Sequence, residues 1–134
     1  MKQALWIPGD LPGLNDILRL RGRGHYAWNT AKKKAEERIG WLAKELALKP
    51  MPFPVTFTFV WIKQNRRLDK DNVAAGGRKI ILDALVKVGV LHGDGWKHID
   101  GWRDEFKVSR SKPGVFVVMD SEGAGGIDID QRIP

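Results

Sequence analysis

Two aspartates, Asp69 and Asp71, stand one residue apart in a stretch that is otherwise basic, with Arg66, Arg67 and Lys70 beside them. If this stretch is extended, side chains at positions i and i+2 point to the same side, so the two carboxylates converge. Magnesium binds carboxylate oxygens and keeps water molecules and substrate phosphates as its other ligands. The pattern therefore predicts a Mg²⁺ site for chemistry on a phosphodiester. A solvated charged loop has the same appearance, and that alternative stays open.

A third acidic residue, Asp94, lies between Gly93 and Gly95. An aspartate in such a setting is most often a turn residue. A loop also exposes a side chain for function, however, and a metal site built on Asp69 and Asp71 would gain from a third carboxylate. We therefore retain Asp94 as a candidate metal ligand.

Charge is unevenly distributed along the 134 residues, whose net charge is +7. Residues 1–119 contain 22 basic and 12 acidic residues, a net of +10, whereas residues 120–134 contain four acidic residues and one Arg, a net of −3. A basic body is typical of nucleic-acid binding, although solubility alone can explain a basic surface. We expect basic side chains to bind backbone phosphates without reading base sequence. The predicted DNA contacts are Arg19, Arg21, Arg23, Lys32, Lys33, Arg66, Arg67, Lys70 and Arg78.

Composition excludes several classes of protein. Cysteine is absent, which rules out disulfides, thiolate catalysis and zinc–thiolate sites and is consistent with a reducing compartment. The histidines, at positions 25, 92 and 98, are scattered and form no zinc motif. No apolar run approaches the roughly 18 residues of a membrane helix, and the first residues have no signal-peptide core. We expect a soluble, cytoplasmic protein with no membrane partner and no small-molecule cofactor.

Periodicity predicts the elements that position these residues. Strands are expected over residues 2–7, 55–62, 98–110 and 115–119. Helices are expected over residues 29–48, capped by Asn29 or Thr30, and over residues 79–88, after an interruption at Gly76 and Gly77. The predicted fold class is therefore α/β (α+β), a small mixed or antiparallel sheet of about four strands packed with two main helices. It forms one domain, residues 1–120, followed by a Gly-rich acidic tail, residues 121–134, that we expect to be mobile.

Three segments together resemble the RusA family of Holliday junction resolvases, which are common in phages and prophages. They are Arg66 to Asn72, Lys79 with Asp83-Ala84-Leu85, and Lys87 to Asp94. The resemblance extends from about residue 54 to residue 110, is weak over the N-terminal third and is absent from the tail. It implies a homodimeric endonuclease that nicks branched DNA in a bacterial cell and has one active site per subunit. The implied metal ion is Mg²⁺, for which Mn²⁺ can substitute.

Carried over by position, the resemblance makes Asp69, Asp71 and Asp94 the metal-binding aspartates and Lys79 the catalytic lysine. The interval before Lys79 is longer than the family's pattern, so Arg78 is the alternative functional cation. The acidic loop also lacks a second carboxylate next to Asp94. These residues would hold one or two metal ions and contact the scissile phosphate.

Two other functions are weighed against the nuclease. One is a non-catalytic protein that binds branched DNA, in which the acidic pair is only a turn. The other is a Mg²⁺ enzyme acting on nucleotide-sugars, which the absence of a nucleotide-binding βαβ pattern disfavours. For assembly, we expect a homodimer, because the strand 55–61 and the helix 79–88 offer more apolar surface than a three- or four-stranded sheet with two helices can bury alone.

Overall fold

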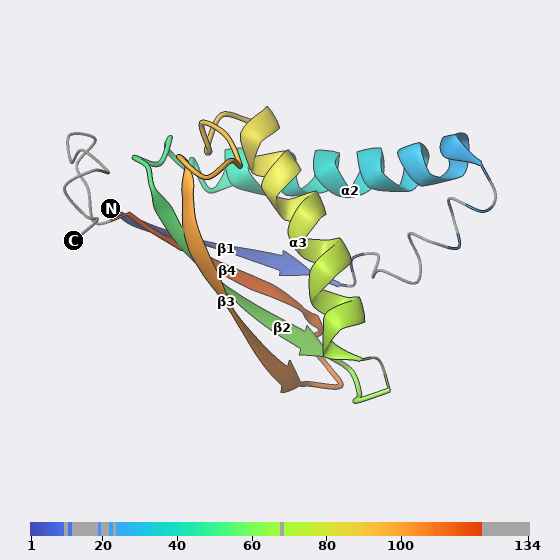
Figure 1. Cartoon of the computed structure of the whole chain (residues 1–134). Helices are drawn as coiled ribbons and strands as arrows, with labels where there is room; N and C mark the ends of the chain where they lie inside the picture. The colour runs from blue at the N-terminus through green and yellow to red at the C-terminus, as the bar shows by residue number, and fades with distance from the viewer. Residues whose placement is uncertain (10, 12–18, 20–21, 23, 68, 122–134) are drawn as a thin grey trace.

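The computed structural model describes residues 1–9, 11, 19, 22, 24–67 and 69–121 (Figure 1). Its elements follow the order β1 (Lys2–Pro8), α2 (His25–Glu45), β2 (Val55–Lys63), α3 (Lys70–Lys87), β3 (Ile99–Val108) and β4 (Gly114–Asp120). The predicted DNA contacts Arg21 and Arg23 lie outside the described residues, as does the expected tail beyond Ser121. Arg19 is described and exposed.

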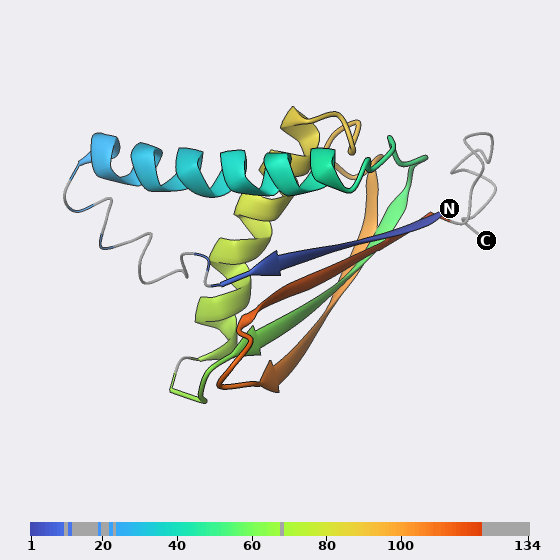
Figure 2. The same cartoon turned by 180° about the vertical axis from the view of Figure 1, so that it is seen from behind.

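The four strands form one mixed sheet in the order β1-β4-β2-β3. β2 and β3 are parallel, whereas β4 is antiparallel to both β1 and β2. Both helices lie on the same side of this sheet, and no helix of the described residues lies on the other side (Figures 1 and 2). The predicted α+β class, with about four strands and two main helices, is confirmed. None of the helices among the described residues is long and apolar enough to cross a membrane.

Alternation along the strands directs the large apolar side chains toward the helices. Val55, Phe57, Phe59 and Trp61 of β2 are all buried, with exposed fractions of 2 % or less. The buried residues of the neighbouring elements include Leu5, Ile7, Ile39, Ile80, Ile81, Leu85, Val117 and Met119. A single chain therefore buries the strand and helix surface from which a homodimer was inferred, so that reason for a dimer is wrong.

The second helix begins nine residues earlier than predicted. α3 runs without interruption from Lys70 to Lys87, and it includes Gly76 and Gly77, both buried. A Cβ built on Gly77 would lie 2.6 Å from the ring of Trp61, so the missing side chain lets the helix approach the sheet closely. Here glycine provides space for packing and does not break the helix.

The first helix also differs from the prediction at its start. α2 begins at His25, so Asn29 and Thr30 lie inside the helix and neither caps it. It ends at Glu45, three residues before the expected end, and Ala47 follows with a left-handed φ of 52°. The observed strands agree with the predicted ones to within two residues at each end.

Candidate functional site

The two aspartates lie where β2 passes into α3. Asp69 is the N-cap residue, with φ −67° and ψ 145°, and its carbonyl oxygen accepts a 3.1 Å hydrogen bond from the Val73 amide. Asp71 is the second residue of the helix, and both side chains are exposed. The condition of an extended segment is met at Asp69 but not at Asp71, since the pair spans a strand-to-helix boundary, so the argument that the two carboxylates converge does not apply. The positive end of the helix dipole favours negative charge at this position.

A basic hollow of about 370 Å³ lies next to this helix start. It is formed by the end of β2, the following turn, the first turn of α3 and the end of β3. Four cationic side chains line it, Lys63, Arg66, Lys70 and Lys107. The Lys70 ammonium lies over the ring of Phe106, 5.3 Å from its centroid. Four cations around one hollow suit an anionic ligand such as a DNA phosphate.

Asp69 and Asp71 fit Mg²⁺ by their chemistry, because an exposed carboxylate pair leaves positions for water and for phosphate oxygens. Among the described residues, no three His, Asp or Glu side chains lie close enough together to share a metal ion. In the described part of one chain, the two aspartates therefore have no third carboxylate beside them.

Asp94 lies at the other end of α3. It is exposed in the loop that leads into β3, and β3 begins beside the start of β2. Since α3 has 18 residues, this end of the helix is about 27 Å from Asp69 and Asp71. The loop that precedes β3 and the turn that precedes α3 lie at opposite ends of the helix in Figure 1. The structure thus places two of the three predicted metal ligands at the start of α3 and the third near its other end.

The two candidate cations of α3 have different surroundings. Lys79 is exposed, and its Nζ lies 3.4 Å from Asp83, a loose contact on the helix surface. Arg78 forms an ion pair with Asp104 of β3, and its guanidinium lies 4.6 Å from the ring centroid of Trp102. A phosphate would have to compete with Asp104 for Arg78, whereas Lys79 has no such strong partner among the described residues.

Asp104 was missed by sequence reasoning. Its carboxylate is half-buried and accepts a 2.9 Å hydrogen bond from Trp61 Nε1 as well as the contact from Arg78. The signal was present in the alternation of β3, because Asp104 shares a face with Trp102 and Phe106 and so points toward the helices. A carboxylate on an apolar face needs a partner from the layer above it, here Arg78.

Two cations predicted to contact DNA lie in the turn after β2, where Arg66 and Arg67 are both exposed. Lys32 has a different setting, since its Nζ lies 2.9 Å from Asp83 and 3.5 Å from Glu36. The hydrogen bond from Lys32 to Asp83, partly opposed by burial and assisted by both carboxylate charges, raises the pKa of Lys32 above its ordinary 10.5. Lys32 thus contributes to the contact between α2 and α3.

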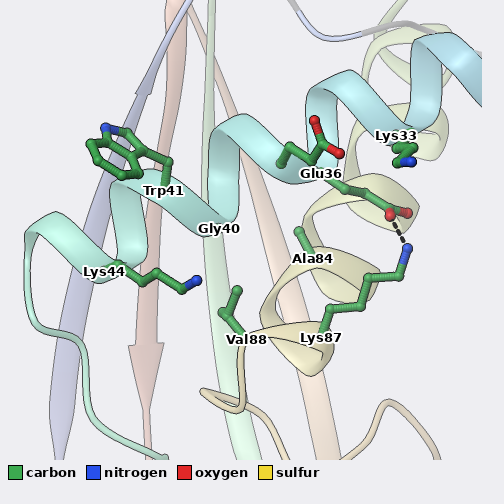
Figure 3. Close-up of a pocket in the computed structure, with 9 residues that line it drawn as sticks. Lys33, Glu36, Gly40, Trp41, Lys44, Ala84, Lys87 and Val88 are labelled. Atoms are coloured by element: carbon green, nitrogen blue, oxygen red, sulfur yellow. Dashed lines mark hydrogen bonds and ion pairs between the residues drawn. The ribbon is translucent and has the colours of Figure 1, made fainter.

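A second basic hollow, of about 350 Å³, lies between α2 and α3 (Figure 3). Lys33 and Lys44 of α2 lie at its edges, and Trp41 borders it with 63 % of its surface exposed. Glu36 is almost fully buried and forms an ion pair with Lys87 across the hollow. Of the two α2 lysines predicted to contact DNA, Lys33 is exposed, whereas Lys32 is half-buried and paired with Asp83.

Comparison with models of protein families and with curated proteins found no match. What the site can do follows from its side chains. Two carboxylates at a helix start, next to a hollow lined by four cations, can hold a divalent ion beside a bound phosphate.

Proposed function

We propose that the protein is a Mg²⁺-dependent endodeoxyribonuclease that nicks branched DNA, with four-way junctions as its main substrate, in the manner of the RusA family. The observation that carries the proposal is the position of Asp69 and Asp71 beside the four-cation hollow. The proposed site of the reaction is the cytoplasm of a bacterial cell, with the protein encoded by a phage or prophage.

Each side chain of the site has a distinct part in the proposed reaction. Asp69 and Asp71 hold the Mg²⁺ ion, which when bound supplies a water of lowered pKa and neutralises charge on the phosphate oxygens. Lys70 and Arg66 bind phosphates on either side of the scissile bond, since both line the hollow next to the aspartates. These contacts orient the backbone without reading its sequence.

Asp94 enters the proposal through a homodimer. About 27 Å of helix separates it from Asp69 and Asp71 within one chain, so one metal ion cannot bind all three. A two-fold axis that sets two α3 helices antiparallel would bring the start of each helix toward the end of the other. Asp94 of one subunit would then complete the metal site of the partner, whereas Lys79, at the middle of α3, lies about equally far from both ends of the helix. This geometry replaces unburied apolar surface as the reason to expect a dimer.

Two sites related by a two-fold axis match a substrate with the same symmetry. A four-way junction presents two equivalent strands at its centre, and one subunit can nick each of them. A duplex also has two-fold axes that relate its antiparallel strands, so a symmetric pair of sites suits both kinds of DNA. The choice of junctions over linear DNA therefore rests on the resemblance to the RusA family.

The proposal is tested by incubating the full chain with end-labelled four-way, three-way and linear DNA, with Mg²⁺ or with EDTA. Paired nicks near the junction centre, formed with Mg²⁺ alone, are the expected result. Binding to junctions that is equal with Mg²⁺ and EDTA, with no nicks in either, would identify a non-catalytic branched-DNA-binding protein. Asp120→Asn, an exposed aspartate at the end of β4, is the matched control for changes in surface charge.

A further inference from the structure

Two tryptophans are exposed beside one hollow at the start of β3. Trp96 is 99 % exposed and Trp102 is 54 % exposed. Both line an open hollow of about 530 Å³ together with Asp94 and Asp100. Large aromatic side chains in contact with water at one place usually mark a binding site.

The exposure of Trp96 is set by how its loop packs. The rings of His92 and His98 both contact Phe53, with centroids 5.2 and 4.8 Å away. His98 also packs against Gly93, where a Cβ would come within 2.7 Å of its ring. His92 and His98 thus pack on Phe53, whereas Trp96 is almost fully exposed.

Trp102 is held in place from one side. The Arg78 guanidinium lies 4.6 Å from its ring centroid, and Asp104 fixes that guanidinium by an ion pair. Asp104 is itself bound by Trp61 Nε1 at 2.9 Å. A ring that is already oriented loses little conformational freedom when a ligand stacks on it.

The polar groups of the hollow indicate the part of a nucleotide that fits. When no cation is bound, Asp94 and Asp100 repel a phosphate, but a nucleobase is uncharged and carries N–H donors whose hydrogen bonds carboxylates accept. Lys97, next to Trp96 in the loop, lies over Phe53 at 5.4 Å and supplies a cation for a neighbouring phosphate. Aromatic rings for bases, with a cation close by, are the usual components of single-strand binding.

We propose that Trp96 and Trp102 form a stacking site for unpaired nucleobases of the DNA substrate. The inference rests on the proposed function, since it requires that DNA is the ligand. Bases inside a duplex already stack on their neighbours, whereas bases at a strand exchange point can be displaced and leave a face open. A base held here lies next to Asp94, so stacking would position the branch point at the proposed metal site.

The test uses a short single-stranded oligodeoxynucleotide and a duplex of the same sequence, both with EDTA so that no cleavage occurs. Trp96→Ala is expected to weaken single-strand binding roughly 10-fold, and Trp96→Phe to restore most of it, because base stacking requires a ring. Duplex binding is expected to stay unchanged. Trp41→Ala removes another exposed tryptophan, which lies on α2 outside this hollow and is 63 % exposed, and is the control.

The readouts are fluorescence anisotropy of the labelled DNA and quenching of protein tryptophan fluorescence by the single strand. Unchanged single-strand affinity in Trp96→Ala, or an equal loss for single strand and duplex, would overturn the proposal. Dissociation of a dimer by Trp96→Ala, seen by sedimentation, would also overturn it, since a second copy of the chain would then cover the ring. Trp102→Ala is a second variant, and a thermal melt shows whether it folds.

The outcome separates this inference from the nuclease proposal. Nicking of junctions with normal single-strand binding in Trp96→Ala would leave the nuclease intact and remove the stacking site. Single-strand binding that depends on Trp96, in a protein that nicks no DNA with Mg²⁺, would support the stacking site and remove the nuclease proposal.

Discussion

Lys32 of α2 and Asp83 of α3 form an ion pair in which Lys32 Nζ lies 2.9 Å from the Asp83 carboxylate. The pair joins the two helices that cover the sheet, and Asp83 is only 18 % exposed. Burial pushes the pKa of Asp83 upward, but the hydrogen bond and charge of Lys32, together with Lys79, outweigh it and leave that pKa below its ordinary 3.8. Stability should therefore depend on pH through this pair.

Asp83→Asn is expected to lower the free energy of unfolding by about 1 kcal/mol at neutral pH, because the pair is partly screened by solvent. The contribution of Asp83 is fully present above pH 3.8 and is lost as the pH falls through its lower, folded pKa. That of Lys32 is present below pH 10.5 and is lost as the pH rises through its higher, folded pKa. Urea unfolding of the native protein and of Asp83→Asn from pH 2 to 7 measures the loss of stability at low pH. If the free energies of unfolding of the two proteins ran parallel over this pH range, the prediction would be contradicted.

Asp69→Asn and Asp71→Asn are each expected to abolish nicking of four-way junctions while leaving junction binding intact or tighter. Each change removes a metal ligand and also removes negative charge next to bound phosphate. Nicking assays with Mg²⁺ and binding assays with EDTA measure the two effects separately. Undiminished cleavage by either variant would remove these aspartates from the site, and Asp120→Asn is the control.

Lys79→Ala and Arg78→Ala are expected to fail in different ways. Lys79→Ala should fold with nearly unchanged stability, because its contact with Asp83 is loose and exposed, and should lose on the order of 10²-fold in nicking rate. Arg78→Ala should lower the free energy of unfolding by about 1–3 kcal/mol, because it leaves the half-buried Asp104 without its cation. Thermal melts and single-turnover nicking distinguish the two. If Lys79→Ala cuts normally and a folded Arg78→Lys does not, Arg78 is the functional cation.

The strands were predictable because alternation between buried and exposed residues is visible in the sequence, as in Val55 to Trp61. The start of α3 could not be predicted, because Gly77 looks like a helix break in the sequence. Its role depends on contact with Trp61, a residue that is distant along the chain. The same limit applies to the site. Asp69 and Asp71 were identified from their types and spacing, but the separation of Asp94 depends on the direction in which α3 runs across the sheet.

Gly77→Ala is expected to destabilise the fold, although alanine in place of glycine usually stabilises a helix by about 1 kcal/mol. The added methyl group would lie 2.6 Å from the Trp61 ring, so the helix or the ring must move, at a cost of about 1–3 kcal/mol. Gly101→Ala, where the new methyl group meets open space, is the control and should leave stability unchanged. A melting temperature of Gly77→Ala above that of the native protein would show that the close approach of α3 to β2 is not required.

Mixing two inactive variants tests whether Asp94 acts across a dimer. Asp71→Asn and Asp94→Asn should each be inactive alone, yet a mixed dimer retains one intact site, with the unchanged Asp69 and Asp71 of one chain and the unchanged Asp94 of the other. Random exchange at equal concentrations makes half of the dimers mixed, so about a quarter of the native number of sites is expected to return. Because each mixed dimer has a single site, the recovered activity should give single nicks and few paired ones. No recovery after subunit exchange, confirmed by sedimentation of differently tagged chains, would place Asp94 outside the partner's metal site.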